Sequence, residues 1–161
     1  MRARALLLAL VAASGTGASV AHAQERSGHA LTFVPSVGFA AIADNGHVAS
    51  GGMTAVAEME IRSGRAALTA YAATRGIGVS CSDGCDRGGQ SLGADLSLAA
   101  GPLGLGAGIG ALHRSAGWRA QPHGRVWWDR GIVRLQVRVE VPDGWDDVHV
   151  PLLVGLRMPV G

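Results

Sequence analysis

Two cysteines lie close together in the chain, as Cys81 and Cys85 of the segment CSDGC. The Asp-Gly pair between them favours a tight turn that brings the two sulfur atoms together, and an oxidising compartment keeps such a pair as a disulfide. We therefore predict a Cys81–Cys85 disulfide in an exposed loop. A metal site completed by Asp83 and Asp86 is the alternative, although structural metal sites usually draw on a second pair of ligands.

Histidines and acidic residues gather in segments that we expect to lie near the outer rim of the fold, in the long connections or beside them. Imidazole and carboxylate groups are common metal ligands, so these segments could bind a divalent cation. Polar loops also collect such residues without binding metal. We predict no metal ion, and no pattern in the chain requires a cofactor. The residues concerned are His47, His113, His149, Asp143, Asp146 and Asp147.

The segment His113-Arg114-Ser115 could support catalysis. It is similar to the His-x-Ser motif of outer-membrane lipid A deacylases, in which a histidine activates a serine nucleophile. The chain departs from that motif at Ala116, where the family has asparagine, and no carboxylate is placed to orient His113. We predict that His113 is a rim residue and that the chain is not an enzyme. A lipid A acyl hydrolase is the alternative.

Charged residues also share one side of segments in which polar and apolar residues alternate. In 131–141, valine and leucine occupy every second position and arginine, glutamine and glutamate occupy most of the others, which is the period of a β-strand. We predict that ten charged residues form a network inside a narrow barrel, and the alternative is that they line a conducting pore. They are Glu58, Glu60, Arg62, Arg75, Asp95, Arg125, Arg134, Arg138, Glu140 and Arg157.

Eight segments of about ten residues have this alternation, and together they predict an all-β fold. Most are separated by residues that favour turns, such as glycine, proline, aspartate and asparagine. The predicted strands cover residues 30–42, 53–62, 65–78, 92–100, 103–112, 119–128, 131–141 and 149–160.

The connections between the predicted strands alternate between long and short. The expected long connections are 44–52, 79–90, 114–118 and 142–147, and the expected short ones are Ser63-Gly64, Gly101-Pro102 and 129–131. This alternation is typical of an up-and-down barrel whose two ends face different environments. Transmembrane β-barrels have short periplasmic turns and longer outer loops.

The distribution of charge and glycine predicts which face of each strand points inward. One charge facing hydrocarbon near the middle of the membrane costs about 2–4 kcal/mol, so we place the charged faces inside the barrel. Glycine recurs on the same faces, at positions 93, 104, 106, 108, 110 and 155, where it leaves room for arginine side chains. We expect the tryptophans at the two membrane interfaces, with Trp127 and Trp128 at one and Trp118 and Trp145 at the other.

The N-terminal segment has the features of a secretory signal. Arg2 and Arg4 precede an apolar run over 5–13, and Ala21-His22-Ala23 supplies a cleavage site, so we predict a signal peptide over 1–23 and a barrel domain over 24–161. The 14 basic residues are all arginine, and removal of two leaves twelve against twelve acidic residues. A neutral mature chain with dispersed arginines has no nucleic-acid footprint.

Over residues 30–161 the chain resembles the small outer-membrane β-barrel family of Gram-negative-type bacteria. The segment Gly155-Leu156-Arg157-Met158-Pro159-Val160 is similar to the C-terminal assembly signal of that family, although it contains proline and lacks a terminal aromatic residue. The resemblance implies an eight-stranded antiparallel up-and-down transmembrane β-barrel. It also implies outer-membrane lipid and the barrel assembly machinery as partners.

We therefore expect a monomeric outer-membrane barrel with a structural or surface-interaction role through its extracellular loops. A secreted soluble periplasmic barrel that binds a small apolar ligand in an apolar interior would show the same strand alternation. The two alternatives differ in the environment of the apolar face of each strand, which would contact lipid in the first and form the protein core in the second.

Overall fold

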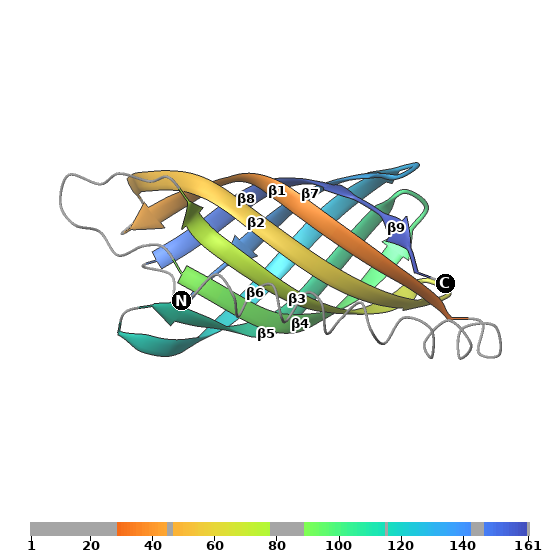
Figure 1. The fold of residues 1–161 in the computed structure, drawn as a ribbon, viewed down its shortest axis with the longest axis horizontal. Helices are drawn as coiled ribbons and strands as arrows, with labels where there is room; N and C mark the ends of the chain where they lie inside the picture. Colours follow the sequence, from red (N-terminus) through yellow and green to blue (C-terminus); the bar gives the residue numbers. More distant parts are fainter. Residues whose placement is uncertain (1–28, 45–46, 78–88, 115, 143–146, 161) are drawn as a thin grey trace.

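A computed structural model describes residues 29–44, 47–77, 89–114, 116–142 and 147–160 (Figure 1). The predicted signal peptide over 1–23 and the predicted Cys81–Cys85 disulfide lie outside these ranges. Within them, no helix is long and apolar enough to span a membrane.

The described residues form nine antiparallel strands that close into a barrel (Figure 1). Each strand from β1 to β7 pairs with the next along the chain, and β1 also pairs with β8 and β9. β9 keeps the register of β8 against β1, so the two strands occupy one position and the barrel is eight-stranded. The strands are β1 (Ala30–Asp44), β2 (His47–Ser63), β3 (Ala66–Ile77), β4 (Gly89–Ala100), β5 (Leu103–Arg114), β6 (Gly117–Arg130), β7 (Val133–Glu140), β8 (Asp147–Leu156) and β9 (Met158–Pro159).

The strands are strongly staggered around the barrel. Starting at Thr32 of β1 and moving from each residue to its partner on the next strand, the path returns to β1 at Ile42, ten residues further along. Such a stagger requires strands that are tilted by roughly 35–45° from the barrel axis. The path passes through Glu60, Thr69, Asp95, Gly108, His123, Glu140 and His149. Charged and histidine side chains from β2, β4, β6, β7 and β8 are therefore neighbours around the inner wall.

Three two-residue turns, at 64–65, 101–102 and 131–132, join strands at one end of the barrel. The sequence predicted a short connection at each place, but only Gly101-Pro102 has the predicted bounds, since β2 includes Ser63 and β6 includes Asp129 and Arg130. Each turn begins with a glycine whose φ angle is positive, at Gly64 (59°), Gly101 (61°) and Gly131 (60°). Two-residue hairpin turns favour this conformation, which glycine adopts without steric cost. β9 and the start of β1 lie at the same end (Figure 1), which we call the turn end.

Two of the long connections that we expected at the opposite end are wrong. β1 and β2 continue to Asp44 and His47, and β5 and β6 continue to Arg114 and Gly117, so only two residues separate each pair of strands. Residues 47–52, which we expected in a loop, instead belong to β2 and pair with the end of β1, from Gly52 opposite Ala40 to His47 opposite Asp44. Longer intervals separate β3 from β4 and β7 from β8.

Large apolar side chains point outward from β1 to β8. The inward faces carry the buried charged and polar side chains, together with glycines and a few apolar residues such as Val34, Leu112 and Leu153. Leu96, Leu105 and Ile109 are among the most exposed large apolar side chains, at 70%, 65% and 63%. By contrast, Arg134 and Arg138 of β7 are fully buried inside the barrel. The barrel is therefore inverted relative to a water-soluble protein, which buries its apolar side chains.

One tryptophan prediction is wrong, because Trp127 lies inside the barrel. Its side chain is 2% exposed, whereas Trp118 and Trp128 face outward at 58% and 37%. Trp127 is the partner of Gly104 on β5, and its ring occupies the space that a side chain at Gly104 would fill. Gly93 and Gly110 similarly adjoin the Tyr71 hydroxyl, and Gly106 adjoins Nε of Arg125. The inward glycines thus make room for aromatic rings as well as for an arginine.

We predict that Gly104→Ala destabilises the barrel, because the added methyl group meets the Trp127 ring. Overpacking of this kind costs about 1–3 kcal/mol. Gly124→Ala is the matched control, since its methyl group would meet a single oxygen at 3.8 Å. Urea unfolding in detergent micelles measures both variants, and equal midpoints would contradict the proposed Gly104–Trp127 contact.

Candidate functional site

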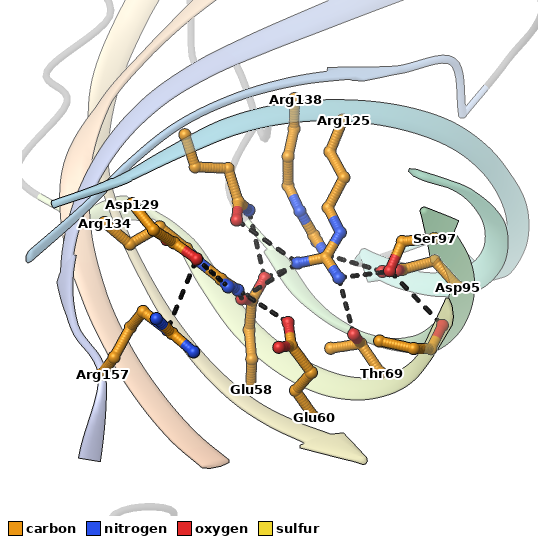
Figure 2. Close-up of polar contacts among 12 residues, drawn as sticks. Glu58, Glu60, Thr69, Asp95, Ser97, Arg125, Asp129, Arg134, Arg138 and Arg157 are labelled. Atoms are coloured by element: carbon orange, nitrogen blue, oxygen red, sulfur yellow. Dashed lines mark hydrogen bonds and ion pairs between the residues drawn. The ribbon is translucent and has the colours of Figure 1, made fainter. Parts of the chain in front are cut away.

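The ten charged residues singled out from the sequence line the inside of the barrel, and we call them the lumenal charge network. Eight of them are buried, whereas the side chains of Arg62 and Arg157 are 21% and 26% exposed. Of the eight, four are carboxylates and four are arginines, so their formal charges cancel. Figure 2 shows much of the network, in which side chains from several strands point toward one another across the lumen.

Glu58 of β2 lies at the centre of the network and faces three arginines. Its carboxylate oxygens lie 3.1 Å from Arg125, 3.7 Å from Arg134 and 3.2 Å from Arg138, and all four side chains are fully buried. Gln136 also donates a hydrogen bond to Glu58 at 3.0 Å. Because β2 and β6 are four strands apart in the ring of eight, the Glu58–Arg125 pair spans the lumen.

Asp95 of β4 is a second carboxylate shared between strands. Its oxygens lie 2.7 Å from Arg125 and 3.4 Å from Arg138, and the His123 ring is 3.6 Å away. Arg125 also donates a hydrogen bond to Thr69 of β3 at 2.6 Å (Figure 2). The two guanidinium groups thus contact both Glu58 and Asp95, and together they connect β2, β4, β6 and β7.

A cluster near the turn end surrounds Arg134. The guanidinium donates to both oxygens of Asp129, at 2.8 and 3.0 Å, and to Glu60 at 2.9 Å. Arg62 pairs with Glu60 at 2.7 Å. Figure 2 shows Arg157 beside Asp129, with 3.4 Å between the two groups. A planar guanidinium matches the two oxygens of a carboxylate, so the Arg134–Asp129 pair holds the β6–β7 hairpin at its turn.

A further cluster surrounds Arg75 in the half of the barrel away from the turn end. The guanidinium pairs with Glu140 at 2.6 Å and donates to Ser91 and Gln121 at 3.1 and 3.2 Å. Its Nη1 atom also lies 3.2 Å from Nδ1 of His149. β3 and β7 are four strands apart in the ring, so the Arg75–Glu140 pair is a second contact across the lumen.

Two aromatic rings lie beside the arginines of the network. The Arg125 and Arg134 guanidinium groups lie 4.6 and 5.0 Å from the centre of the Trp127 ring. Arg138 lies 4.1 Å from the centre of the Tyr71 ring. A cation over an aromatic face is stabilised by the ring quadrupole, by about 2 kcal/mol or more when water is excluded. These contacts with the rings add to the ion pairs that stabilise the buried arginines.

Several members of these clusters were not singled out from the sequence. Asp129 was assigned to the turn after the predicted strand 119–128, but it lies within β6, one residue before the end of that strand. Gln136 and Tyr71 lie on the inward faces beside predicted network members, so the strand alternation alone could have found them. His149 was expected at the rim, but it is 1% exposed and lies between Arg75 and Arg114.

The remaining site predictions are only partly within the described residues. His113 is exposed on β5 and its ring packs against Trp118, with centres 4.9 Å apart. Ser115, Asp143 and Asp146 lie outside the described residues. In the described part of the chain, no three histidine, cysteine or acidic side chains are grouped to hold a metal ion.

The lumenal charge network fills the lumen together with a smaller apolar cluster of Val56, Tyr71, Ala73 and Leu153. The interior of an eight-stranded barrel is just wide enough for side chains to fill it. The interior is charged, so the apolar ligand site considered from the sequence does not fit this barrel. The geometry supplies structural cross-links between opposite strands.

No protein-family model and no curated protein matches the chain. Among solved structures, the barrel is similar to that of Neisserial surface protein A, with a TM-score of 0.55 and 12% sequence identity over 80% of this chain and 96% of that one. Ail, the attachment invasion locus protein of Yersinia pestis, aligns over 81% of this chain and 98% of its own at 10% identity, with a TM-score of 0.42. The similarity to the neisserial protein supports the eight-stranded barrel fold.

We predict that Glu58→Gln destabilises the barrel by about 3–5 kcal/mol, because it leaves buried arginines without their shared carboxylate. The exposed Arg130→Gln is the control and should change the free energy of unfolding by less than about 0.5 kcal/mol. Urea unfolding in detergent micelles measures the changes. A double variant with Arg138→Gln should lose less than the sum of the single losses, and strict additivity would contradict direct coupling.

Proposed function

We propose that the mature chain is an outer-membrane β-barrel of a Gram-negative-type bacterium, with a structural or surface-interaction role through its outer loops. The observation that supports this most strongly is the inverted polarity of the barrel wall. Water-soluble monomers rarely expose apolar patches larger than a few hundred Å². Here large apolar side chains are exposed on all eight strands from β1 to β8.

The position of exposed charges supports the same location. Among the side chains whose exposure the structure describes, the exposed charged ones are Arg65 in a turn, Arg130 at the last position of β6 and Arg119 at its third position. All three lie near the ends of the barrel. Between the ends, the outer surface consists of apolar residues and glycine, which suits contact with lipid acyl chains.

The height of the apolar surface matches a bilayer. Along β6, the outward tryptophans Trp118 and Trp128 are separated by ten residues. At about 3.3 Å per residue and a tilt of roughly 40°, this separation corresponds to about 25 Å along the barrel axis. Transmembrane barrels have an apolar band about 25 Å tall between two aromatic girdles. We therefore place Trp118 and Trp128 at the two interfaces.

The packed lumen supports a scaffold role in preference to a conducting one. We propose that the barrel acts as a monomer, without catalysis, and that the barrel assembly machinery inserts it through the segment 155–160. We also propose that the turn end faces the periplasm and the opposite end faces the outside. The similar barrel in Neisseria is by its name a surface protein, which is in line with this placement.

The membrane proposal predicts different costs for two arginine substitutions on β5. Ile109 is 63% exposed near the middle of the strand, and Leu103 is 54% exposed at the turn end. Ile109→Arg should reduce the free energy of folding into lipid vesicles by about 2–4 kcal/mol, and Leu103→Arg by about 0–1 kcal/mol.

Equilibrium folding into vesicles, followed by tryptophan fluorescence, measures both substitutions. A water-facing surface would tolerate either arginine within about 0.5 kcal/mol. Equal costs for the two positions, or recovery of the native protein in the soluble periplasmic fraction without detergent, would contradict the membrane location.

A further inference from the structure

A groove interrupts the outer wall between β6 and β7, in the half of the barrel away from the turn end. It has a volume of about 640 Å³, within the range of small-molecule sites. Its outer walls are formed by Ala120, Pro122 and Gly124 of β6 and by Val139, Val141 and Pro142 at the end of β7. These six residues offer no charged side chain to a ligand.

The groove exists because pairing along β7 weakens there. The register between β6 and β7 ends at His123 and Glu140, although β6 extends six residues further to Gly117. Beyond that point, the Val141 amide donates to the Pro122 carbonyl at 3.0 Å. Pro122 and Pro142 have no N–H group, so neither can donate a hydrogen bond to close the seam.

The other edge of β7 is interrupted at the same level. Its register with β8 passes from the Val137–Leu152 pair directly to the Glu140–His149 pair. Pro151 lies between these pairs on β8 and has no N–H group to donate. β7 therefore has a gap in its ladder with β8, and its ladder with β6 ends at Glu140, whereas β4 and β5 keep an unbroken ladder of eleven residue pairs.

Space is left beside the backbone on the β6 side of the groove. A side chain at Gly124 would meet one atom within 4 Å, the Gly106 carbonyl oxygen at 3.8 Å. Val139 on the opposite wall is 38% exposed. The hollow is therefore open to the exterior, and its walls present apolar groups that a flexible hydrocarbon chain can contact. His123 also lines the hollow, and its buried ring lies 3.6 Å from Asp95 and 3.4 Å from the Tyr71 hydroxyl inside the barrel.

We propose that this groove binds an acyl chain of a bilayer lipid in the leaflet away from the turn end. The groove is continuous with the apolar outer surface, so lipid chains are the molecules that surround its opening. A bound chain would cover the weakly paired end of β7 and limit access of water to the buried Glu140 and His123 behind it. This inference rests on the proposed membrane location.

The experiment uses the full mature barrel in phosphatidylcholine vesicles that contain a phospholipid with a diazirine on one acyl chain. After illumination, mass spectrometry locates the labelled residues. We expect labelling at 120–124 and 139–142 to exceed labelling of the outward residues of β4 several-fold. Gly124→Trp should reduce groove labelling several-fold, and Ala94→Trp on the outer face of β4 is the matched control that should not.

Each alternative outcome would contradict a different part of the proposal. Even labelling of the groove and β4 overturns the groove and leaves the membrane location intact. A protein that does not insert into vesicles overturns the proposed function itself. A dimer in detergent with unlabelled groove residues would show that a second copy occupies the groove. If Gly124→Trp does not fold, Val139→Phe fills the same space from the opposite wall and carries the same expectation.

Discussion

The pairing of buried charge across the lumen is the constraint on which the rest of the barrel depends. Glu58 contacts three arginines from β6 and β7, and each contact closes a gap between strands that share no backbone hydrogen bonds. Removal of Glu58 leaves buried arginines without the carboxylate that they share, which is costly in a water-excluded interior. Among the eight buried members of the network, four carboxylates offset four arginines.

The charged interior and the apolar exterior follow from the same alternation along each strand. Side chains of successive residues point to opposite faces, so one strand supplies both the lumenal network and the lipid-facing surface. On β7, Arg134, Gln136 and Arg138 project inward while Leu135 and Val137 project outward. A shift of one residue would exchange the two faces, so the network and the membrane surface jointly fix the register.

Strand positions and face assignments could be predicted from the sequence because both depend on local alternation. Partners across the lumen could not, since the stagger that brings Glu58 to Arg125 is a property of the closed ring. Trp127 was misplaced because its residue type suggested an interface, whereas its parity with Arg125 placed it inside. The strand pairing through Gly51 and Gly52 was missed because a glycine-rich composition also favours turns. The groove bordered by prolines could not be predicted, because it forms only when three strands are placed side by side.

The orientation of β7 tests the central claim most directly. Single spin labels placed at the outward positions Val133, Leu135, Val137 and Val139, in a Cys81→Ala, Cys85→Ala background in vesicles, report access to oxygen and to a water-soluble nickel chelate. The structure predicts high oxygen access and low nickel access at Leu135 and Val137, in the middle of this face. High nickel access at Leu135 and Val137 would show that this face meets water, and would contradict a barrel with charge inside and lipid outside.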